Sequence, residues 1–331
     1  MKSYLKLLSF IGFLWLMACG SKIEILNEPA PIIDIEQAQK IMQQQDNWVL
    51  FEISQSSKYA AQHIENAFHL WRNDYSNLID FEYGGMRASK KQLEQLLSKY
   101  AVDHQTKILL YDTKGNVDAA RFAWQLELFG FNNFYLMDGG KKAWQMAKKP
   151  LTNKIPALPK PTQFKFQQAI ENQSLLADQK EVWRGIQDTQ TLIIDTREIY
   201  EYQGTPFQKA GQIFPYKKGA FKNGAIPTAI HYNWSNTVNL AFDHTMKSLA
   251  DIKFDLAKIG VKPEKKIIIY CQSGVRSAHT SFVLRHLLHY PNVENYDGSW
   301  IEWTYQNVNG SQTSPTQINA TDEQLQAFQD K

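Results

Sequence analysis

Hydrophobic residues along the chain form short unbroken runs that alternate with longer amphipathic stretches. The runs Leu192–Ile194 and Ile267–Tyr270 lack the polar–apolar alternation of a half-exposed strand, so they predict strands that are buried on both faces of a parallel sheet. The stretch from Ala278 to Tyr290 has the periodicity of a helix. Strands and helices in alternation predict an α/β fold, with a mostly parallel sheet flanked by helices.

This pattern occurs twice in the chain. Five residue pairs lie 159 positions apart: Asp112 and Cys271, Gly115 and Gly274, Asp138 and Asp297, Gly139 and Gly298, Trp144 and Trp303. Each half also opens with a helical pattern, Ile35–Gln44 and Leu175–Ile186, which Asp34 and Ser174 precede as N-caps. We therefore expect two copies of one fold.

Proline and polar residues mark the expected domain boundaries. Four prolines fall within the sixteen residues 148–163, which prevents a helix there and favours an extended connector. We therefore expect a first domain over residues 32–149, a linker over 150–165 and a second domain over 166–309. Residues 310–331 are rich in Ser, Thr, Gln and Asn, and we expect this tail not to pack against the domains.

The N-terminus has the features of an export signal. Lys2 and Lys6 precede an apolar run, Leu7–Ala18, that is short for a membrane-spanning helix. The stretch Leu16–Cys19 resembles a bacterial lipobox. That resemblance implies a signal peptide over residues 1–18, a lipid on Cys19 and a tether over residues 19–31. We expect the mature protein in the cell envelope, anchored on the periplasmic side of a bacterial membrane. The alternative, a buried N-terminal helix, is disfavoured because no capping residue precedes the run.

Charge and cysteine content narrow the functional classes. The formal net charge is +3, and it falls to +1 without Lys2 and Lys6. No block of like charge indicates a surface for polyanions, so we expect no nucleic-acid partner. The chain has two cysteines. If Cys19 carries a lipid, Cys271 is the only thiol and no disulfide can form within the chain. A lone thiol in an exported protein indicates either chemistry or deep burial.

Cys271 stands where a predicted strand ends and a predicted helix begins, within the stretch Cys271-Gln272-Ser273-Gly274-Val275-Arg276-Ser277. Gly274 allows the tight turn that this connection needs. Backbone N–H groups of such a turn, the helix N-terminus and the cation of Arg276 all favour a thiolate over a thiol. The alternative is a buried cysteine that packs as a small hydrophobic residue. A Ser-Gly turn followed by an arginine fits a core position poorly.

These motifs together resemble those of the tandem-domain rhodaneses, the thiosulfate and 3-mercaptopyruvate sulfurtransferase family. The resemblance extends over residues 32–308, and four motifs carry it: DTREIYEYQG from Asp195, GAIPTA from Gly224, CQSGVRS from Cys271 and YDGSWIEW from Tyr296.

The resemblance implies an enzyme that moves a sulfane sulfur from a small-molecule donor, through a persulfide on Cys271, to cyanide or a thiol acceptor. A protein could also accept the sulfur. The substrate-binding loop would consist of Gln272, Ser273, Gly274, Val275, Arg276 and Ser277. No metal and no cofactor would be needed. In the first domain Asp112 occupies the cysteine position and Val117 the arginine position, so that domain would be catalytically inactive.

The donor is open on sequence grounds. Thiosulfate-preferring tandem members place basic residues where this chain has Ser273 and Glu201. A serine at position 273 resembles the loop of the mercaptopyruvate-using branch, which has a serine at the same place. Thiosulfate is favoured because Arg276 offers it a counter-charge. Arg197, in the stretch Asp195-Thr196-Arg197, is expected to form a structural ion pair beneath the loop rather than to contact substrate.

Two rival functions remain. A cysteine phosphatase also holds an anion between strand and helix, but it has five residues between Cys and Arg, whereas four separate Cys271 from Arg276 here. A non-catalytic, lipid-anchored sulfur carrier would use the same cysteine without turnover. His231 and His244 lack metal-ligand spacing. Trp234, Trp300 and Trp303 are expected in the core more than in the cleft.

Overall fold

The computed structural model describes residues 31–44, 47–209, 211–214, 216–309 and 316–317. The predicted signal peptide, Cys19, nearly all of the tether and most of the C-terminal tail lie outside these residues. Within the described ranges, no helix is long and apolar enough to cross a membrane.

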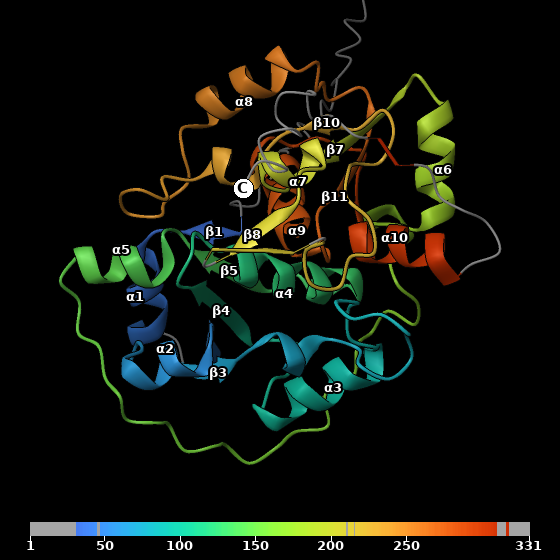
Figure 1. The fold of residues 1–331 in the computed structure, drawn as a ribbon. Coiled ribbons are helices and arrows are strands. Elements are labelled where there is room, and N and C mark those ends of the chain that lie inside the picture. The colour runs from blue at the N-terminus through green and yellow to red at the C-terminus, as the bar shows by residue number, and fades with distance from the viewer. Residues whose placement is uncertain (1–30, 45–46, 210, 215, 310–315, 318–331) are drawn as a thin grey trace, which may run out of the picture.

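The first half of the chain forms a five-stranded parallel sheet with helices on both faces (Figure 1). Its strands follow the spatial order β1-β5-β4-β2-β3, with bounds β1 Ile32–Ile33, β2 Trp48–Ile53, β3 Phe68–Leu70, β4 Lys107–Asp112 and β5 Phe134–Met137. Its α-helices are α1 Ile35–Gln44, α2 Ser56–Ala61, α3 Lys90–Lys99, α4 Val117–Leu128 and α5 Gly140–Met146.

The second half repeats this sheet in the order β10-β7-β11-β12-β6. These strands are β6 Leu176–Ala177, β7 Thr191–Asp195, β10 Ile230–His231, β11 Lys266–Tyr270 and β12 Val293–Tyr296. Its α-helices are α6 Gln179–Gln187, α7 Ile199–Gln203, α8 Leu249–Lys258, α9 Val275–Phe282 and α10 Ser299–Asn309. A two-stranded antiparallel ribbon, β8 Phe207–Lys209 and β9 Gln212–Phe214, extends from this domain. The prediction of a doubled α/β fold is therefore confirmed.

The central strands are apolar on both faces because helices cover both. Ile267, Ile268, Ile269 and Tyr270 of β11 are all fully buried. Continuous burial of this kind is typical of a parallel sheet between two helical layers. Both strands predicted from unbroken apolar runs, Leu192–Ile194 and Ile267–Tyr270, lie within β7 and β11.

One of the two predicted opening helices is confirmed, and the other begins later than expected. Helix α1 spans Ile35–Gln44, and Asp34 Oδ1 accepts the N–H of Gln37 at 2.7 Å as its N-cap. In the second domain the expected helix start is wrong. Leu176 and Ala177 form strand β6 beside β12, and α6 begins at Gln179 with Asp178 as its N-cap. Ser174 therefore caps no helix; its hydroxyl donates to Asn172.

The helix predicted over Ala278–Tyr290 is present in two parts. Helix α9 begins earlier, at Val275, and a π-helical turn over Val283–Leu287 follows it. The wider turn ends the helix before Tyr290, which donates its N–H to the Leu284 carbonyl.

The proline-rich linker runs in an extended path along the first domain (Figure 1). Thr152 pairs with His63 as an isolated β-bridge, and Phe164 is 4% exposed in the core next to Phe131. At the described end of the tail, Gln317 forms a similar bridge with Ala225. The expectation that the tail does not pack against the domains is wrong at Gln317, whose backbone is hydrogen-bonded to Ala225.

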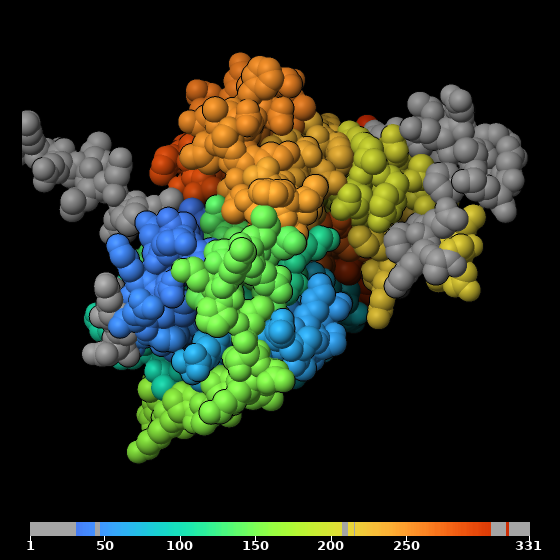
Figure 2. Space-filling model, turned by 90° about the vertical axis from the view of Figure 1, so that its left-hand side faces the viewer, coloured from blue at the N-terminus to red at the C-terminus, as the bar shows by residue number. Residues whose placement is uncertain are grey.

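The two domains meet face to face, as Figure 2 shows from the side. Helix α4 of the first domain packs against α9 of the second. At this interface the guanidinium of Arg121 is buried; it forms an ion pair with Asp297 and donates to the Gly85 carbonyl at 3.1 Å. Arg87 forms a second ion pair with Asp297 at 3.0 Å. Asp297 is almost fully buried, so its carboxylate needs cations beside it. The first domain supplies two of them, Arg87 and Arg121.

Candidate active site

Cys271 follows β11 directly, and a tight loop carries the chain from it into α9. Gly274 precedes that helix with a φ of 74°, a conformation that favours glycine. A side chain at this position would also lie 2.7 Å from both the Arg121 guanidinium and the Asp297 carbonyl. Both the turn and the close packing of the first domain therefore require glycine here.

Ser299 braces the two ends of this loop. Its hydroxyl accepts the N–H of Cys271 at 3.1 Å and the N–H of Gly274 at 3.0 Å, and it donates to the Tyr296 carbonyl at 2.7 Å. Ser299 is fully buried and has a φ of 52°. Sequence reasoning placed Ser299 within the YDGSWIEW motif but missed its role. The N–H groups of Cys271 and Gly274 are committed to Ser299, so they do not point at the sulfur.

Other groups of the loop stabilise the Cys271 thiolate. Cys271 is 1% exposed, and the Ser277 hydroxyl donates to its sulfur at 3.5 Å. Burial raises the pKa of the Cys271 thiol. The Arg276 cation, the Ser277 hydroxyl and the backbone N–H groups of Ser277 and Ser273 outweigh that effect, so the net pKa lies below its ordinary value. The expected anion nest is present, with a composition partly different from the one predicted.

The first domain shows what such a loop binds. Asp112 stands at the position of Cys271, and its carboxylate accepts the N–H groups of Lys114, Asn116 and Asp118 at 2.7 to 2.8 Å. Burial, followed by the neighbouring charge of Asp118, raises the pKa of Asp112 to about 6. The first-domain loop is thus occupied by a carboxylate of the chain itself, where the second domain presents a sulfur.

Arg276 lines the cleft in front of Cys271, and its guanidinium is also paired with a carboxylate of its own domain. Its guanidinium forms two hydrogen bonds with the Glu201 carboxylate, at 2.6 and 3.1 Å. Lys217 approaches the same carboxylate at 3.1 Å. Burial raises the pKa of Glu201, but Arg276 and Lys217 lower it to about 2. Glu201, which stood out as a departure from the family's basic residue, is therefore the partner of Arg276.

The remaining loop residues form the walls of the site. The Gln272 side chain is 9% exposed and donates to the Lys218 carbonyl at 3.3 Å. Ser273 lies against Gly85 of the first domain, where an added Cβ would come within 2.6 Å of the Ser273 Cβ. Val275 packs in a small apolar cluster with Trp234.

Asp195 and Arg197 form the expected ion pair beneath the site. The Arg197 guanidinium contacts Asp195 at 2.6 Å, and both side chains are buried. The Tyr270 hydroxyl donates to the same carboxylate at 2.6 Å, and Arg197 also donates to the Gly224 carbonyl at 2.7 Å. The pair holds the ends of β7 and β11 together, and neither side chain lines the cleft in front of Cys271.

The sulfur opens onto a cleft of about 320 Å³ between the domains. The second domain contributes Lys217 and Trp234 besides the cysteine loop, and the first contributes Arg72, Lys114 and Asp118. Sequence reasoning missed these first-domain residues, because no motif marks them and only the packing of the domains brings them to Cys271.

Several cations face this cleft. Arg72 pairs with Asp118 at 2.8 Å and remains 46% exposed. The Lys114 ammonium lies 5.5 Å from the centre of the Trp234 ring and makes no ion pair with any described residue. Burial and the nearby Arg276 lower the pKa of Lys217. Beside the carboxylates of Asp118 and Glu198, the cleft therefore offers ammonium and guanidinium groups to a small anion.

Residues considered for other roles lie mainly in the core. Trp300 and Trp303 are buried in the second domain, as expected, whereas Trp234 is buried and also lines the cleft. The His231 ring bonds to the Arg197 carbonyl at 2.8 Å. In the described part of the chain, no group of three or more His, Cys, Asp or Glu residues could hold a metal ion.

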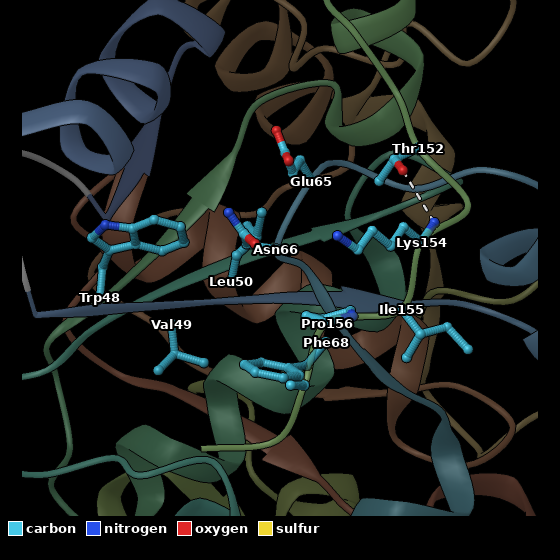
Figure 3. A pocket seen from close by; sticks show the side chains of 11 residues that line it. Trp48, Val49, Leu50, Glu65, Asn66, Phe68, Thr152, Lys154, Ile155 and Pro156 are labelled. Atoms are coloured by element: carbon cyan, nitrogen blue, oxygen red, sulfur yellow. Dashed lines mark hydrogen bonds between the residues drawn. The ribbon is translucent and has the colours of Figure 1, made fainter. Parts of the chain in front are cut away.

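A larger cavity, of about 390 Å³, lies in the first domain away from Cys271. Trp48, Phe68 and Lys154 point toward it, and the linker forms one wall (Figure 3). Its lining includes no cysteine, serine or histidine. The interdomain cleft is therefore the site where a nucleophile meets open space.

Both α/β domains contain the same kind of anion-binding loop, and the loop of the second domain carries a cysteine. These two features are typical of one class of protein. The family model for the rhodanese-like domain matches residues 34–147 and 178–306. The chain therefore belongs to the rhodanese family, with two domains in tandem.

Named relatives cover most of the chain. It is 30% identical over 249 residues to the "Sulfur carrier protein TtuD" of Thermus thermophilus, across 74% of this chain and 83% of that protein. It is 32% identical over 260 residues to a "Putative thiosulfate sulfurtransferase" of Saccharopolyspora erythraea, across 78% and 88%. At the level of its family, the chain is a sulfurtransferase or a sulfur carrier.

Solved structures share the fold. The crystal structure of YnjE superposes with a TM-score of 0.71 at 23% identity, over 87% of this chain and 70% of that one. The anaerobic ergothioneine biosynthesis enzyme from Chlorobium limicola gives a TM-score of 0.72 at 19% identity, over 88% and 71%. At these identities the likeness concerns the fold alone.

Proposed function

We propose that the protein is a sulfurtransferase that carries a sulfane sulfur on Cys271 from thiosulfate to cyanide or a thiol. The supporting observation is the pair of loops: the N–H groups that hold the Asp112 carboxylate in the first domain have counterparts around the Cys271 sulfur in the second. A loop of this kind stabilises an anion, and a persulfide is an anion that extends from a cysteine.

In the first step, the Cys271 thiolate attacks the outer sulfur of thiosulfate. A new S–S bond forms, the S–S bond of thiosulfate breaks, and sulfite leaves with the electron pair of that bond. The Ser277 hydroxyl and the loop N–H groups stabilise the thiolate before the attack, and we expect them to stabilise the persulfide afterwards.

In the second step, cyanide or a thiolate attacks the outer sulfur of the persulfide. Thiocyanate or a new persulfide leaves, and the electron pair of the broken S–S bond returns to Cys271 as thiolate. No external oxidant or reductant is consumed. A protein thiol could act as the acceptor if it reaches the cleft.

The cleft favours thiosulfate over 3-mercaptopyruvate for an electrostatic reason. Thiosulfate carries two charges, and Arg72, Lys114 and Lys217 line the approach to the sulfur. Lys114 makes no ion pair with a described residue, whereas Arg72, Lys217 and Arg276 each share their charge with a carboxylate. We expect all four cations to contribute counter-charge, with Lys114 the least neutralised of them.

Steady-state formation of thiocyanate from thiosulfate and cyanide separates an enzyme from a carrier. We expect the wild-type chain to turn over many times and Cys271→Ser to be inactive while it keeps its thermal unfolding midpoint. A chain that accepts one sulfur per molecule, but does not turn over with cyanide or small thiols, would instead be the sulfur carrier. Hydrolysis of an aryl phosphate would favour the phosphatase.

We also propose that a lipid on Cys19 anchors the protein at the periplasmic side of a membrane. The lipobox-like stretch supports this proposal. Cys19→Ala should move the protein from the detergent-extracted membrane fraction to the soluble fraction, and a variant that stays with the membranes would contradict the anchor.

A further inference from the structure

The first domain has a second basic pocket at the domain boundary, and its lining shares no residue with the cleft in front of Cys271. Its volume is about 280 Å³. The wall consists of the end of α2, the loop after Asp112, helix α5 and His244 of the second domain. Figure 2 shows this side, where the orange segment of the second domain lies on the green segment that includes α5.

When the two domains are matched by the internal repeat, this pocket of the first domain corresponds to a place beside the Cys271 loop in the second. The strands have equivalent registers, because Trp48 pairs with Lys107 as Thr191 pairs with Lys266. In this register Lys58 corresponds to Glu201.

The loop residue Thr113 corresponds to Gln272 by the spacing of 159 positions. Glu201 and Gln272 line a small cavity that lies beside the Cys271 loop. The first domain therefore has a cavity at the corresponding position, with the ammonium group of Lys58 in its wall where the second domain has the carboxylate of Glu201.

The lysines that line this pocket outnumber the carboxylates that line it. Its lining contains three lysines and no carboxylate. Lys141 is neutralised by the buried Glu52 at 3.1 Å. Lys58 and Lys142 make no ion pair with a described residue; the Lys58 ammonium donates to the Thr113 hydroxyl at 3.3 Å. Two ammonium groups from separate helices thus face one cavity.

His244 completes the pocket from the second domain. Burial, followed by the charge of Lys142, lowers the pKa of the His244 ring, although the Leu240 backbone and Asp243 act in the opposite direction. Its Nδ1 is buried and has no hydrogen-bond partner in the described part of the chain. A neutral ring can donate one hydrogen bond to an anion without adding charge.

We propose that this pocket binds a small divalent oxyanion, the class that includes thiosulfate, sulfite, sulfate and phosphate. Lys58 and Lys142 supply the charge, and His244 supplies a hydrogen bond across the domain boundary. The loop itself cannot take this anion, because the Asp112 carboxylate already occupies its N–H groups. Because the ligand touches both domains, its binding favours the docked arrangement over any separated one.

The test uses the full chain with Cys271→Ser, so that no persulfide forms. Isothermal titration with sodium sulfate, at an ionic strength held constant with sodium chloride, measures affinity and stoichiometry. The double variant Lys58→Met/Lys142→Met removes both free ammonium groups. Lys91→Met is the matched control, because Lys91 is an exposed lysine on α3 and is not part of the pocket lining.

We expect the double variant to lose one saturable sulfate site, with affinity reduced by about tenfold or more per lysine, since each is a charge-assisted contact. The control should bind as the parent does, and the unfolding midpoint without sulfate should show that the double variant is folded. Unchanged affinity and stoichiometry in the double variant, or no saturable binding in the parent, would overturn the proposal.

Parallel titrations with thiosulfate and phosphate identify the preferred member of the class. Neither outcome depends on sulfur transfer, because Cys271 is absent. A failure of this site and a failure of the proposed enzymatic function can therefore be told apart.

Discussion

Replacing Ser277 by alanine removes one specific stabilising contact from the Cys271 thiolate. The Ser277 hydroxyl lies 3.5 Å from the sulfur and is buried with it, whereas Arg276 and the loop N–H groups stay in place. A hydrogen bond to a charged group contributes roughly 1.5–3 kcal/mol. With a long contact to sulfur we take the lower end, so the pKa of Cys271 should rise by about one unit.

The pH dependence of alkylation by iodoacetamide reports this pKa, because the thiolate is the reacting species. Below the pKa, Ser277→Ala should react about tenfold more slowly than the wild type, and the two rates should converge at high pH.

Ser281→Ala is the matched control for this experiment. Ser281 lies on the same helix and is buried, and its hydroxyl has no hydrogen-bond partner in the described part of the chain. Its profile should follow the wild type. If the profiles of Ser277→Ala and Ser281→Ala coincide, the hydroxyl does not stabilise the thiolate and this account of the loop is wrong.

Three further outcomes follow from the interface and the cleft. Arg121→Met leaves the buried Asp297 with one cation instead of two, so urea denaturation should show a loss of about 3 kcal/mol, and an unchanged midpoint would contradict that role. The pKa of Glu201 is lowered to about 2 in the folded state, so its contribution to stability is present above its ordinary value near 4.5 and is lost as the pH falls toward 2. Glu201→Gln should therefore flatten the dependence of the unfolding free energy on pH in that window; an equally steep curve would contradict the assignment. Lys217→Met should raise KM for thiosulfate about tenfold at similar kcat, whereas a selective loss of kcat would show that the lysine acts in the chemical step.

Elements governed by local signals were predictable from the sequence. Asp34 ends an extended segment and caps α1, and the unbroken apolar run Ile267–Tyr270 becomes β11. The start of α6 was not predictable in this way. Leu176 and Ala177 fit a helical pattern, but strand pairing with β12 takes precedence over helix propensity, and the cap moves to Asp178.

The site residues that lie on one continuous loop could be predicted from the sequence. Those that come from distant segments could not. Cys271 and its loop could be identified from the strand-to-helix transition and the repeat. The partner of Arg276 could not, because Glu201 lies 75 positions away and reaches it only through the packing of α7 against the loop. For the same reason Arg72 and Lys114 escaped notice.

Ser299 could have been found from the repeat. Gly140 occupies the equivalent position in the first domain, with a φ of 51° against 52° for Ser299. Glycine is the usual residue at this backbone conformation, so a serine there indicates that its hydroxyl makes a specific hydrogen bond. In the first domain an added Cβ at Gly140 would lie 2.6 Å from the Asp112 carbonyl, so that loop has no room for the same hydroxyl.

We expect Cys271 to accept a sulfur atom and the first-domain loop not to accept one. Intact-mass measurement after brief exposure to thiosulfate, or separately to 3-mercaptopyruvate, tests it directly. The account predicts a gain of one sulfur, about 32 Da, from thiosulfate, which cyanide reverses and Cys271→Ser abolishes. No gain in mass from either donor, or an equal gain in Cys271→Ser, would contradict it.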